Sequence, residues 1–431
     1  MGSANKIIIG LVGSFGSGCT TTSIFLEKVK KFHRFCLSDS IKKLAKQRIP
    51  GFNKMDVEER RKTLQDIGDE LRLKDLAALA RPVIEEIKKI KTGDIVIDSI
   101  RNPAEIEAFQ KAFDNFYVFG IDAEADIRWS RLKHIYKHKA KFDRDDERDT
   151  GEDQPKYGQR VKECIEMADI LLNNEESFNK KGKQDFKAID SYAQKVSDYL
   201  GLVASEGKSR QVNFDELFMH YACSIAVRSQ CSKRKVGAII VHERSLTRPI
   251  RNPKRNKIEF KEFKENYPIA AGCNNVPLGA SPCKIDEKDK CYRDFIKKDF
   301  YKNFVFCRNC GKKLTAASLV CSGCKFNNGE LPGKLLDLCR AVHAEEAAIL
   351  QAAKLGGISL EGAKLYSSAF PCMLCCKKII GAGIKSVVYL DPYPMEGSLA
   401  LKMFRDCGIG VRKFEGVTSA AFYKIFQKNL L

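Results

Sequence analysis

The residues of this chain with the clearest chemistry are one histidine, one glutamate and two cysteines. The stretch "HAEEAAIL" places His343 two positions before Glu345, and "PCMLCC" places Cys372 and Cys375 three positions apart behind Pro371. A catalytic zinc ion takes three protein ligands and keeps a fourth position for water. His343, Cys372 and Cys375 supply such a set, and Glu345 remains beside it as a carboxylate without a ligand role.

The same pattern indicates what that carboxylate would do. Zinc lowers the pKa of a bound water towards about 7, and Glu345 can take the proton, pass it to a ring nitrogen and protonate the departing ammonia. H-x-E followed by P-C-x-x-C is the signature of nucleobase deaminases. The alternative is a closed structural site in which Glu345 is an ordinary acid at a helix N-terminus. The combination of the two motifs favours the catalytic interpretation.

Four other cysteines have the spacing of a zinc ribbon. They form two C-x-x-C pairs separated by ten residues, Cys307, Cys310, Cys321 and Cys324. Four thiolates close the coordination shell, so this zinc would be structural, and a redox role is the alternative. We therefore expect two zinc ions per chain. The cysteines left over could build a third metal site or be core thiols; they are Cys231, Cys283, Cys291 and Cys339.

A glycine-rich stretch near the start, "GSFGSGCT", fits G-x-x-x-x-G-K-[ST] except that Cys19 replaces the lysine. Its backbone N–H groups would bind phosphates, Thr20 would reach Mg²⁺, and Asp98 would close the metal site. Without the lysine, fast phosphoryl transfer is not expected. The alternative is a packing scaffold with an empty loop. The expected nucleotide-binding residues are Gly13, Gly16, Ser17, Gly18, Cys19, Thr20 and Asp98.

Two alternations of strands and helices position these motifs, so both halves are expected to be α/β. Apolar runs such as "KIIIGLVG", "DIVID", "FYVFG" and "DILLNN" alternate with helical stretches up to about residue 200, which predicts a parallel sheet. Small and polar residues at 201–211 predict a linker, and the basic stretch "RSLTRPIRNPKRNK" predicts a loop. The expected domains are 1–203 and 212–431, the second interrupted by an insertion at 284–336.

Composition indicates the cellular location and the charge of possible partners. The chain has 431 residues, a net charge of +20 and 17 cysteines, and no apolar run reaches the roughly 18 residues of a membrane span. The first apolar run breaks at glycines too early for a signal peptide, so we expect a cytoplasmic protein whose cysteines bind metal. The positive charge fits a polyanionic partner or a lysine-rich surface.

The second half resembles deoxycytidylate deaminases. The matching segments are "FMHYACSIAVRSQCSKRKVGAIIV", "AAGCNNVPLGASPC", "HAEEAAI", "PCMLCCKKIIGAGIKSVVY" and "DPYP". The resemblance implies a cytidine-deaminase-like α/β/α domain carrying the ribbon as an insertion. It also implies that Asn274 binds the sugar or base, that Ala344 and Ser368 contact the cytosine edge, and that Tyr393 flanks the nucleotide.

The first half resembles nucleotide kinases of the P-loop NTPase class at "RWSRLKH", "RDDERD" and "MADILLNN". Together the halves resemble bacterial antiphage deaminases, which implies conversion of dCTP and dCMP to dUTP and dUMP under control of the P-loop domain. The resemblance further implies a homo-oligomer, commonly a hexamer, and regulation by a nucleotide such as dTTP or by an inhibitory RNA. Two alternatives remain: a deaminase of cytosine in DNA or RNA strands, and a non-enzymatic nucleic-acid-binding regulator.

Overall fold

The computed structural model describes residues 6–426 except 137, 152–154, 176–178, 181–182, 185, 253–256, 284–290, 295–306, 308, 313–320, 325–338 and 392–396. The chain divides into two compact units. The first is Met1–Glu216 with Glu415–Leu431, and the second is Leu217–Phe414. Among the described residues, no helix is both long and apolar enough to cross a bilayer.

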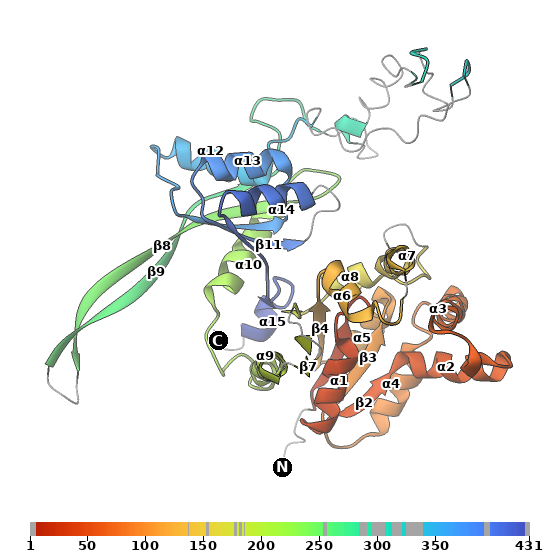
Figure 1. Ribbon diagram of the computed structural model, residues 1–431. Helices are drawn as coiled ribbons and strands as arrows, with labels where there is room; N and C mark the ends of the chain where they lie inside the picture. Colours follow the sequence, from red (N-terminus) through yellow and green to blue (C-terminus); the bar gives the residue numbers. More distant parts are fainter. Residues whose placement is uncertain are drawn as a thin grey trace. The chain divides into compact units, whose positions relative to one another are not determined.

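A six-stranded sheet organises the first unit, in the order β13-β5-β4-β1-β3-β2 (Figure 1). Its strands are parallel except β13, which runs antiparallel to β5. All five residues of β1 are buried, as expected for a parallel strand covered on both faces. The strands are β1 Ile8–Val12, β2 His33–Cys36, β3 Ile95–Ile100, β4 Phe116–Asp122, β5 Ile170–Asn173 and β13 Gly416–Val417.

Helices cover this sheet, and the helix predicted behind Pro103 shows how one of them begins. Asn102 caps α5 and Glu105 completes a capping box, so the first backbone N–H groups of the helix have acceptors. The helices are α1 Cys19–Lys28, α2 Leu37–Arg48, α3 Val57–Lys74, α4 Ala80–Lys89, α5 Pro103–Ala112, α6 Ala125–Leu132, α7 Lys139–Thr150, α8 Val161–Glu166, α9 Phe186–Ala204 and α15 Phe422–Phe426. A 3₁₀ turn at Phe52–Lys54 and a small hairpin of β6 Asn179–Lys180 and β7 Lys183–Gln184 complete the unit.

The chain returns to the first unit after Phe414, which differs from the predicted boundaries. β13 pairs with β5, and Lys424 donates hydrogen bonds to Asp169 and to the backbone oxygen of Phe116. The predicted domain 212–431 therefore extends past the second unit by residues 415–431. A two-residue strand leaves no periodic pattern in a sequence, which is why the return was not foreseen.

The predicted linker at 201–211 is wrong in its first part. Residues up to Ala204 form the last turn of α9, and turns follow through residue 209. Leu202 and Val203 are buried, because they lie on the apolar face of that helix. The glycine and polar residues nearby favour a linker, so the sequence did not indicate this last turn of helix.

The second unit contains a five-stranded sheet in the order β12-β11-β10-β8-β9. β10, β11 and β12 are parallel, and β8 is antiparallel to both β10 and β9. The elements are α10 Phe214–Ala226, which begins in the first unit, β8 Gly237–Asn252, β9 Lys257–Cys273, α12 Ala344–Lys354, β10 Lys364–Ala369, α13 Met373–Gly381, β11 Ser386–Asp391, α14 Gly397–Asp406 and β12 Gly410–Lys413. Its core is aliphatic and aromatic, with Ile240, Leu365, Ile379, Val387 and Phe404 all buried.

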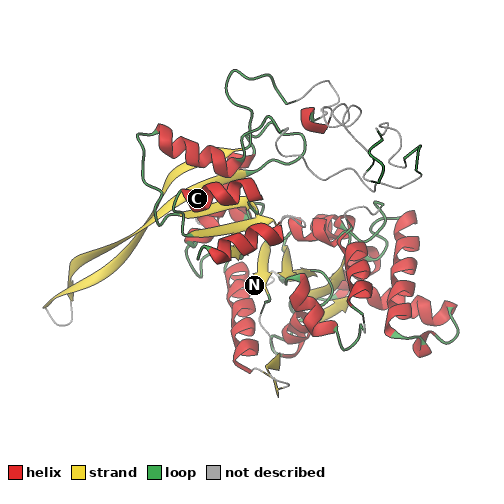
Figure 2. Ribbon diagram, turned by 45° about the horizontal axis from the view of Figure 1, so that its top comes forward, coloured by secondary structure: helices red, strands yellow, loops and turns green. Residues whose placement is uncertain are grey.

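β8 and β9 continue as a long two-stranded ribbon (Figure 2). β10 pairs with β8 only over Ala238–Val241, whereas the β8–β9 register runs to Asn252↔Lys257. The prediction of a loop over "RSLTRPIRN" is therefore wrong. Phe260 is 74% exposed on this ribbon and Ile258 is 69% exposed, so apolar side chains face solvent there.

Candidate active site

Two helix N-termini bring the three predicted zinc ligands together. His343 is the N-cap residue of α12, and Cys372 is the N-cap residue of α13 with Cys375 one turn further on. The Sγ atoms of Cys372 and Cys375 lie 3.3 and 3.5 Å from Nδ1 of His343. All three potential ligand atoms lie within 4.8 Å of one another, a grouping that fits a zinc ion.

Close packing of β9 against α12 fixes where this site forms, and sequence reasoning missed the residue that allows it. A Cβ atom on Gly272 would stand 2.5 Å from the Ala348 nitrogen and 2.7 Å from the Ala344 oxygen. Only glycine therefore lets the strand approach the first turn of the helix that follows His343. A glycine within an apolar strand pattern was the available signal.

Glu345 lies in the interior next to the ligand set. Its side chain is only 4% exposed, and the Cys375 thiol donates to Oε2 at 3.5 Å. Burial raises the pKa of the Glu345 carboxyl. The neighbouring Glu346 instead forms an ion pair with Lys378. Glu345 is thus the carboxylate of this turn that lies against the potential ligand atoms, whereas Glu346 is paired elsewhere.

Cys339 also contacts this centre, which the sequence did not indicate. A hydrogen bond with His343 is the largest cause lowering the pKa of the Cys339 thiol. The same contact is the first cause that raises the pKa of His343 to about 10. The sequence predicts Cys339 as a core thiol or as a ligand of a third metal, and in the fold its partner is His343.

The predicted substrate-contact residues have structural partners. Asn274 accepts a hydrogen bond from the Val236 nitrogen at 2.7 Å and donates to the Arg234 oxygen at 2.8 Å. Ser368 Oγ accepts from the Gly237 nitrogen at 3.0 Å. Both side chains therefore hold the segment that enters β8. Ala344 is fully buried at the start of α12. Tyr393 lies outside the described residues.

The four ribbon cysteines also converge. The thiols pair across the two knuckles, with Sγ–Sγ distances of 3.5 Å for Cys307–Cys324 and 3.6 Å for Cys310–Cys321. The Gly311 nitrogen donates to the Cys307 oxygen, and Gly311 has a φ of +69°, which favours glycine. All four Sγ atoms lie within 4.8 Å of one another, so the group fits a tetrahedral thiolate site.

The glycine-rich loop joins β1 to α1 and has the backbone that its glycines allow. Gly16 and Gly18 have φ values of +80° and +115°. A Cβ on Gly13 would stand 2.3 Å from the Ile121 oxygen, so this position also needs glycine. Thr20 is exposed at the first turn of α1. The structure thus places these residues in a strand–turn–helix connection.

Side chains from distant parts of the first unit occupy the hydrogen-bonding groups of this loop. The Phe15 nitrogen donates to Asp149 at 3.2 Å. Arg131 donates to the Gly16 oxygen at 3.0 Å, and Asn174 donates to the Ser17 oxygen at 2.6 Å. The loop is consequently held in place by protein groups, which sequence reasoning did not anticipate.

Of the expected nucleotide-binding residues, Cys19 is half-buried and Asp98 is buried. Burial raises the pKa of the Cys19 thiol to about 12. Asp98 is 2% exposed and accepts hydrogen bonds from Ser23 at 3.1 Å and Arg34 at 3.3 Å. The hydroxyl partner of Asp98 is therefore Ser23, one helical turn beyond Thr20.

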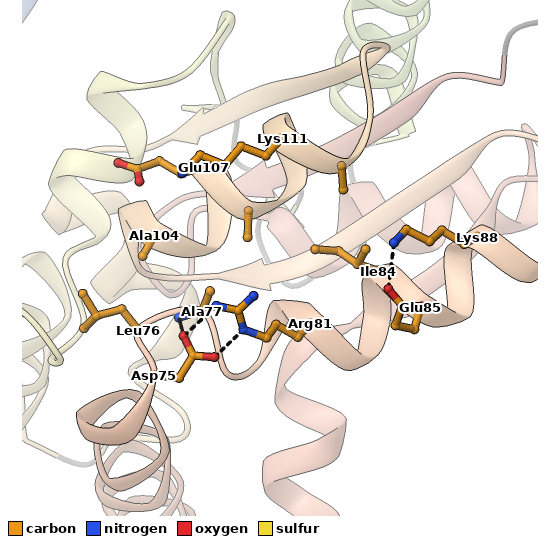
Figure 3. A pocket seen from close by; sticks show the side chains of 12 residues that line it. Asp75, Leu76, Ala77, Arg81, Ile84, Glu85, Lys88, Ala104, Glu107 and Lys111 are labelled. Atoms are coloured by element: carbon orange, nitrogen blue, oxygen red, sulfur yellow. Dashed lines mark hydrogen bonds and ion pairs between the residues drawn. The ribbon is translucent and has the colours of Figure 1, made fainter.

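A groove of about 640 Å³ between α4 and α5 is shown in Figure 3. Asp75 pairs with Arg81, and Glu85 pairs with Lys88 at 2.8 Å. The described lining residues thus present no converging charge of one sign. We assign this groove no chemical role.

Known proteins similar to this chain include deoxycytidylate deaminases. Residues 263–391 match the cytidine and deoxycytidylate deaminase zinc-binding region. The chain is 29% identical over 204 residues to deoxycytidylate deaminase of Schizosaccharomyces pombe, covering 47% of this chain and 44% of that one. It is 27% identical over 177 residues to deoxycytidylate deaminase of Mycobacterium phage D29, covering 41% of this chain and 94% of that one.

A solved structure of dCMP deaminase from cyanophage S-TIM5 in complex with dCMP and dUMP is similar at 21% identity and a TM-score of 0.27. The alignment covers 48% of this chain and 99% of that one. The chain spans less than half the length of the fungal relatives, at 44% for Schizosaccharomyces pombe and 45% for Saccharomyces cerevisiae.

Proposed function

We propose that this chain, in which residues 263–391 match the zinc-binding region of cytidine and deoxycytidylate deaminases, hydrolyses the amino group of free deoxycytidine nucleotides. The observation that carries the proposal is the buried carboxylate of Glu345 beside His343, Cys372 and Cys375. The names of the fungal and phage relatives support dCMP as a substrate.

In this mechanism His343, Cys372 and Cys375 would hold the metal. A zinc ion bound there would supply a water molecule acidic enough to lose its proton near pH 7. Glu345 takes that proton at its carboxylate and delivers it to the ring nitrogen next to the reacting carbon. It then takes the proton of the hydroxyl group now bonded to that carbon and delivers it to the departing amino group, so that cytosine and water give uracil and ammonia. Burial of Glu345 keeps bulk water away from this transfer.

Product analysis with matched variants tests the proposal. The full chain is incubated with dCMP, dCTP and single-stranded DNA, and the products are separated. We expect dUMP or dUTP to form, and Glu345→Ala to lower the rate at least about 100-fold with zinc retained. Glu346→Ala, one position along α12, should stay close to the parent rate. Equal rates for the two variants would remove Glu345 from the mechanism.

A second candidate function is deamination of cytosine in single strands. The observation that favours it is the β8–β9 ribbon, where Phe260 and Ile258 are exposed and exposed Arg251 lies directly opposite Ile258. Aromatic faces next to cations suit a single-stranded polynucleotide. Turnover of single-stranded DNA, with no turnover of the free nucleotides in the same panel, would select this candidate.

We propose that the first unit is a P-loop domain. It would bind a nucleotide together with Mg²⁺ and regulate the second unit. Support comes from the glycine geometry at Gly16 and Gly18 and from the kinase-like segments. Thr20→Ala should alter the response of deamination to dTTP, and Thr21→Ala, equally exposed, should not. Identical dTTP responses in the two variants would reduce the loop to a scaffold.

The wider setting we propose rests on the family resemblance. It comprises a cytoplasmic homo-oligomer of hexameric type, two zinc ions per chain, preference for dCTP in antiphage defence, and control by an inhibitory RNA. The ligand groups of the two cysteine sites support the zinc count. Elemental analysis of protein purified without chelator should give about two zinc ions.

A further inference from the structure

The β8–β9 ribbon extends beyond the sheet from which it starts (Figure 1). β10 pairs with β8 only over Ala238–Val241, and the pairing of β8 with β9 continues from His242↔Tyr267 to Asn252↔Lys257. Over this extension, no third strand pairs with β8 or β9 in the part of the chain that the structure describes. A two-stranded ribbon is at best marginally stable in water, whereas a sheet of three or more strands can be stable. The extension would therefore gain stability from a further strand at one of its edges.

The two edges of the β8–β9 ribbon differ in their capacity to accept another strand. β8 contains Pro249, which has no N–H group to donate. The exposed charged side chains that the structure describes on β8 are all arginines, Arg244, Arg248 and Arg251. Proline and charges of one sign oppose pairing with a further copy of the same strand. β9 has no proline over residues 258–267, so its edge is the one open to a further strand.

The edge of β9 carries apolar groups together with both signs of charge. Phe260 is 74% exposed and Phe263 is 39% exposed, so two aromatic rings contact solvent. Exposed cations and anions occupy the positions around Phe263; they are Lys261, Glu262, Lys264 and Glu265. Opposite charges that face one another across two strands stabilise the pairing, and like charges destabilise it. The edge is therefore suited to a partner strand with the same mixture of charges.

Ion pairs within the β8–β9 ribbon leave these charges available to a partner. Lys264 lies 3.3 Å from Glu243, and Arg248 lies 3.3 Å from Glu265. The side chains of the two cations are 64% and 65% exposed. Ion pairs that water surrounds in this way contribute little stability, so a strand that brings an opposite charge can replace them.

The order of the charges along β9 fits pairing of the strand with itself. Residues that lie opposite one another in a sheet share a face, so two copies of a strand related by a two-fold axis pair antiparallel with one residue opposite its own copy. With Phe263 at the axis, Glu262 lies opposite Lys264 of the second copy, and Lys261 lies opposite Glu265. With Lys261, Glu262 or Lys264 at the axis, that charge lies opposite an identical charge. The sequence order therefore favours the arrangement centred on Phe263.

We propose that β9 pairs antiparallel with β9 of a second copy of this chain, with Phe263 at the two-fold axis. The two ribbons then form one four-stranded sheet, which removes the weakness of an isolated pair of strands. Ile258 lies opposite Pro268 of the second copy, so the proline falls at the end of the paired segment, where its missing N–H interrupts no ladder. The edges of β8 face outward and oppose further addition, so the assembly closes at two ribbons. The pairing does not depend on deamination by the second unit.

Disulfide formation in the full chain tests the position of the axis. Phe263→Cys places two thiols directly opposite one another, about 4.5–5.5 Å apart between Cα atoms, which a disulfide can bridge. With oxidised glutathione, we expect a chain of doubled mass on a gel without reductant. Phe260→Cys is the matched control, because Phe260 lies opposite Asn266 and its two copies are roughly 20 Å apart along the strand. It should crosslink no faster than the parent, whose own cysteines give the background.

The expected rate for Phe263→Cys is at least about tenfold above that of Phe260→Cys, since only the first pair of thiols satisfies the geometry of a disulfide. Equal rates for the two variants would indicate random collision and overturn the proposal. A rate for Phe263→Cys no higher than that of the parent would also overturn it, whether or not the β8–β9 ribbon binds single-stranded DNA.

Charge reversal gives a second measurement that needs no new cysteine. Glu262→Lys sets two cations opposite one another at both ends of the symmetric pair, and Lys264→Glu sets two anions there. Each should raise the Kd of self-association about tenfold, measured by sedimentation over a range of concentrations. The variant that carries both changes restores opposite charges and keeps the net charge of the parent, so its Kd should return to within about threefold. A double variant that associates as weakly as the single variants, or single variants that associate like the parent, would overturn the pairing.

Discussion

Two cysteines at helix N-termini behave in opposite ways in this chain. Cys372 begins α13 with a lowered pKa, and a hydrogen bond from Cys375 is the largest cause, followed by His343 among the favourable contacts. Cys19 begins α1, yet burial and then the Asp98 carboxylate raise its pKa to about 12. The helix end favours a thiolate in both places. The comparison teaches that burial and neighbouring side chains outweigh the helix end in setting the direction of the thiol pKa.

The two regions differ in a second respect. At the second unit's site, three potential ligand atoms face one another, and the Cys375 thiol donates to Glu345. At the first unit's loop, Asp149, Arg131 and Asn174 already occupy backbone groups. The first arrangement is suited to bind an ion, and the second is suited to hold a loop in one shape.

The strongest test of this contrast is Cys375→Ser. Loss of a thiolate ligand should remove about one zinc ion per chain and lower deamination at least about 1,000-fold, because Lewis-acid stabilisation is worth several kcal/mol. Cys376→Ser is the control, since the Cys376 thiol is buried and donates to the Ala400 oxygen. Zinc content and turnover are measured together. Full zinc occupancy in Cys375→Ser would break the comparison.

Alkylation sharpens the contrast at Cys19. The thiolate is the reactive species, so a thiol with a pKa of about 12 should react at least about 100-fold more slowly at pH near 8 than an ordinary thiol. Exposed Cys407 serves as the reference. Mass spectrometry after timed iodoacetamide treatment gives both rates. Similar rates at the two cysteines would show that the Cys19 environment is not closed.

Arg131→Ala tests whether protein groups hold the glycine-rich loop. Hydrogen bonds from a charged group contribute about 1.5–3 kcal/mol, so the loop amides should exchange with solvent about 10- to 100-fold faster. Lys133→Ala, an exposed neighbour, should leave exchange unchanged. Hydrogen exchange of residues 13–20 supplies the measurement. Unaltered protection in Arg131→Ala would contradict the role of its contacts to Gly16 and Ser17.

The smallest effect on deamination is expected at the four-cysteine site of Cys307, Cys310, Cys321 and Cys324. Cys310→Ser should remove about one zinc ion, because a closed thiolate site loses affinity with one ligand, and turnover should stay within about tenfold. Cys407→Ser, outside both ligand groups, should keep both ions. Elemental analysis and turnover are compared for the pair. A Cys310→Ser protein with both zinc ions would contradict the structural-site interpretation.

The sequence predicted best what depends on neighbours along the chain. Cys372 and Cys375 share one helical turn, and the ribbon cysteines come as C-x-x-C pairs, so their spacing indicated the groups that converge in the fold. That these groups hold zinc stays a prediction. The parallel arrangement of β1, β3 and β4 could also be anticipated, because each strand is a buried apolar run.

Contacts between distant residues could not be predicted in this way. Phe15 meets Asp149 across 134 positions, and no local pattern marks that pair. The glycine that admits α12 to β9 depends on a helix more than seventy residues later. The β8–β9 ribbon was wrongly predicted as a loop. Its strand β8 contains Pro249 and several arginines, and these residues favour a loop when the strand is considered without its partner.

The pairing of β13 with β5 has a consequence for synthesis of the protein. The ribosome must synthesise all of residues 217–414 before Gly416 and Val417 are available to pair with β5. The second unit is continuous in the sequence, so it can complete its fold while the first still presents an open strand edge. An open edge is a template for pairing with another strand. During translation, the second unit can therefore fold before the six-stranded sheet of the first unit is complete.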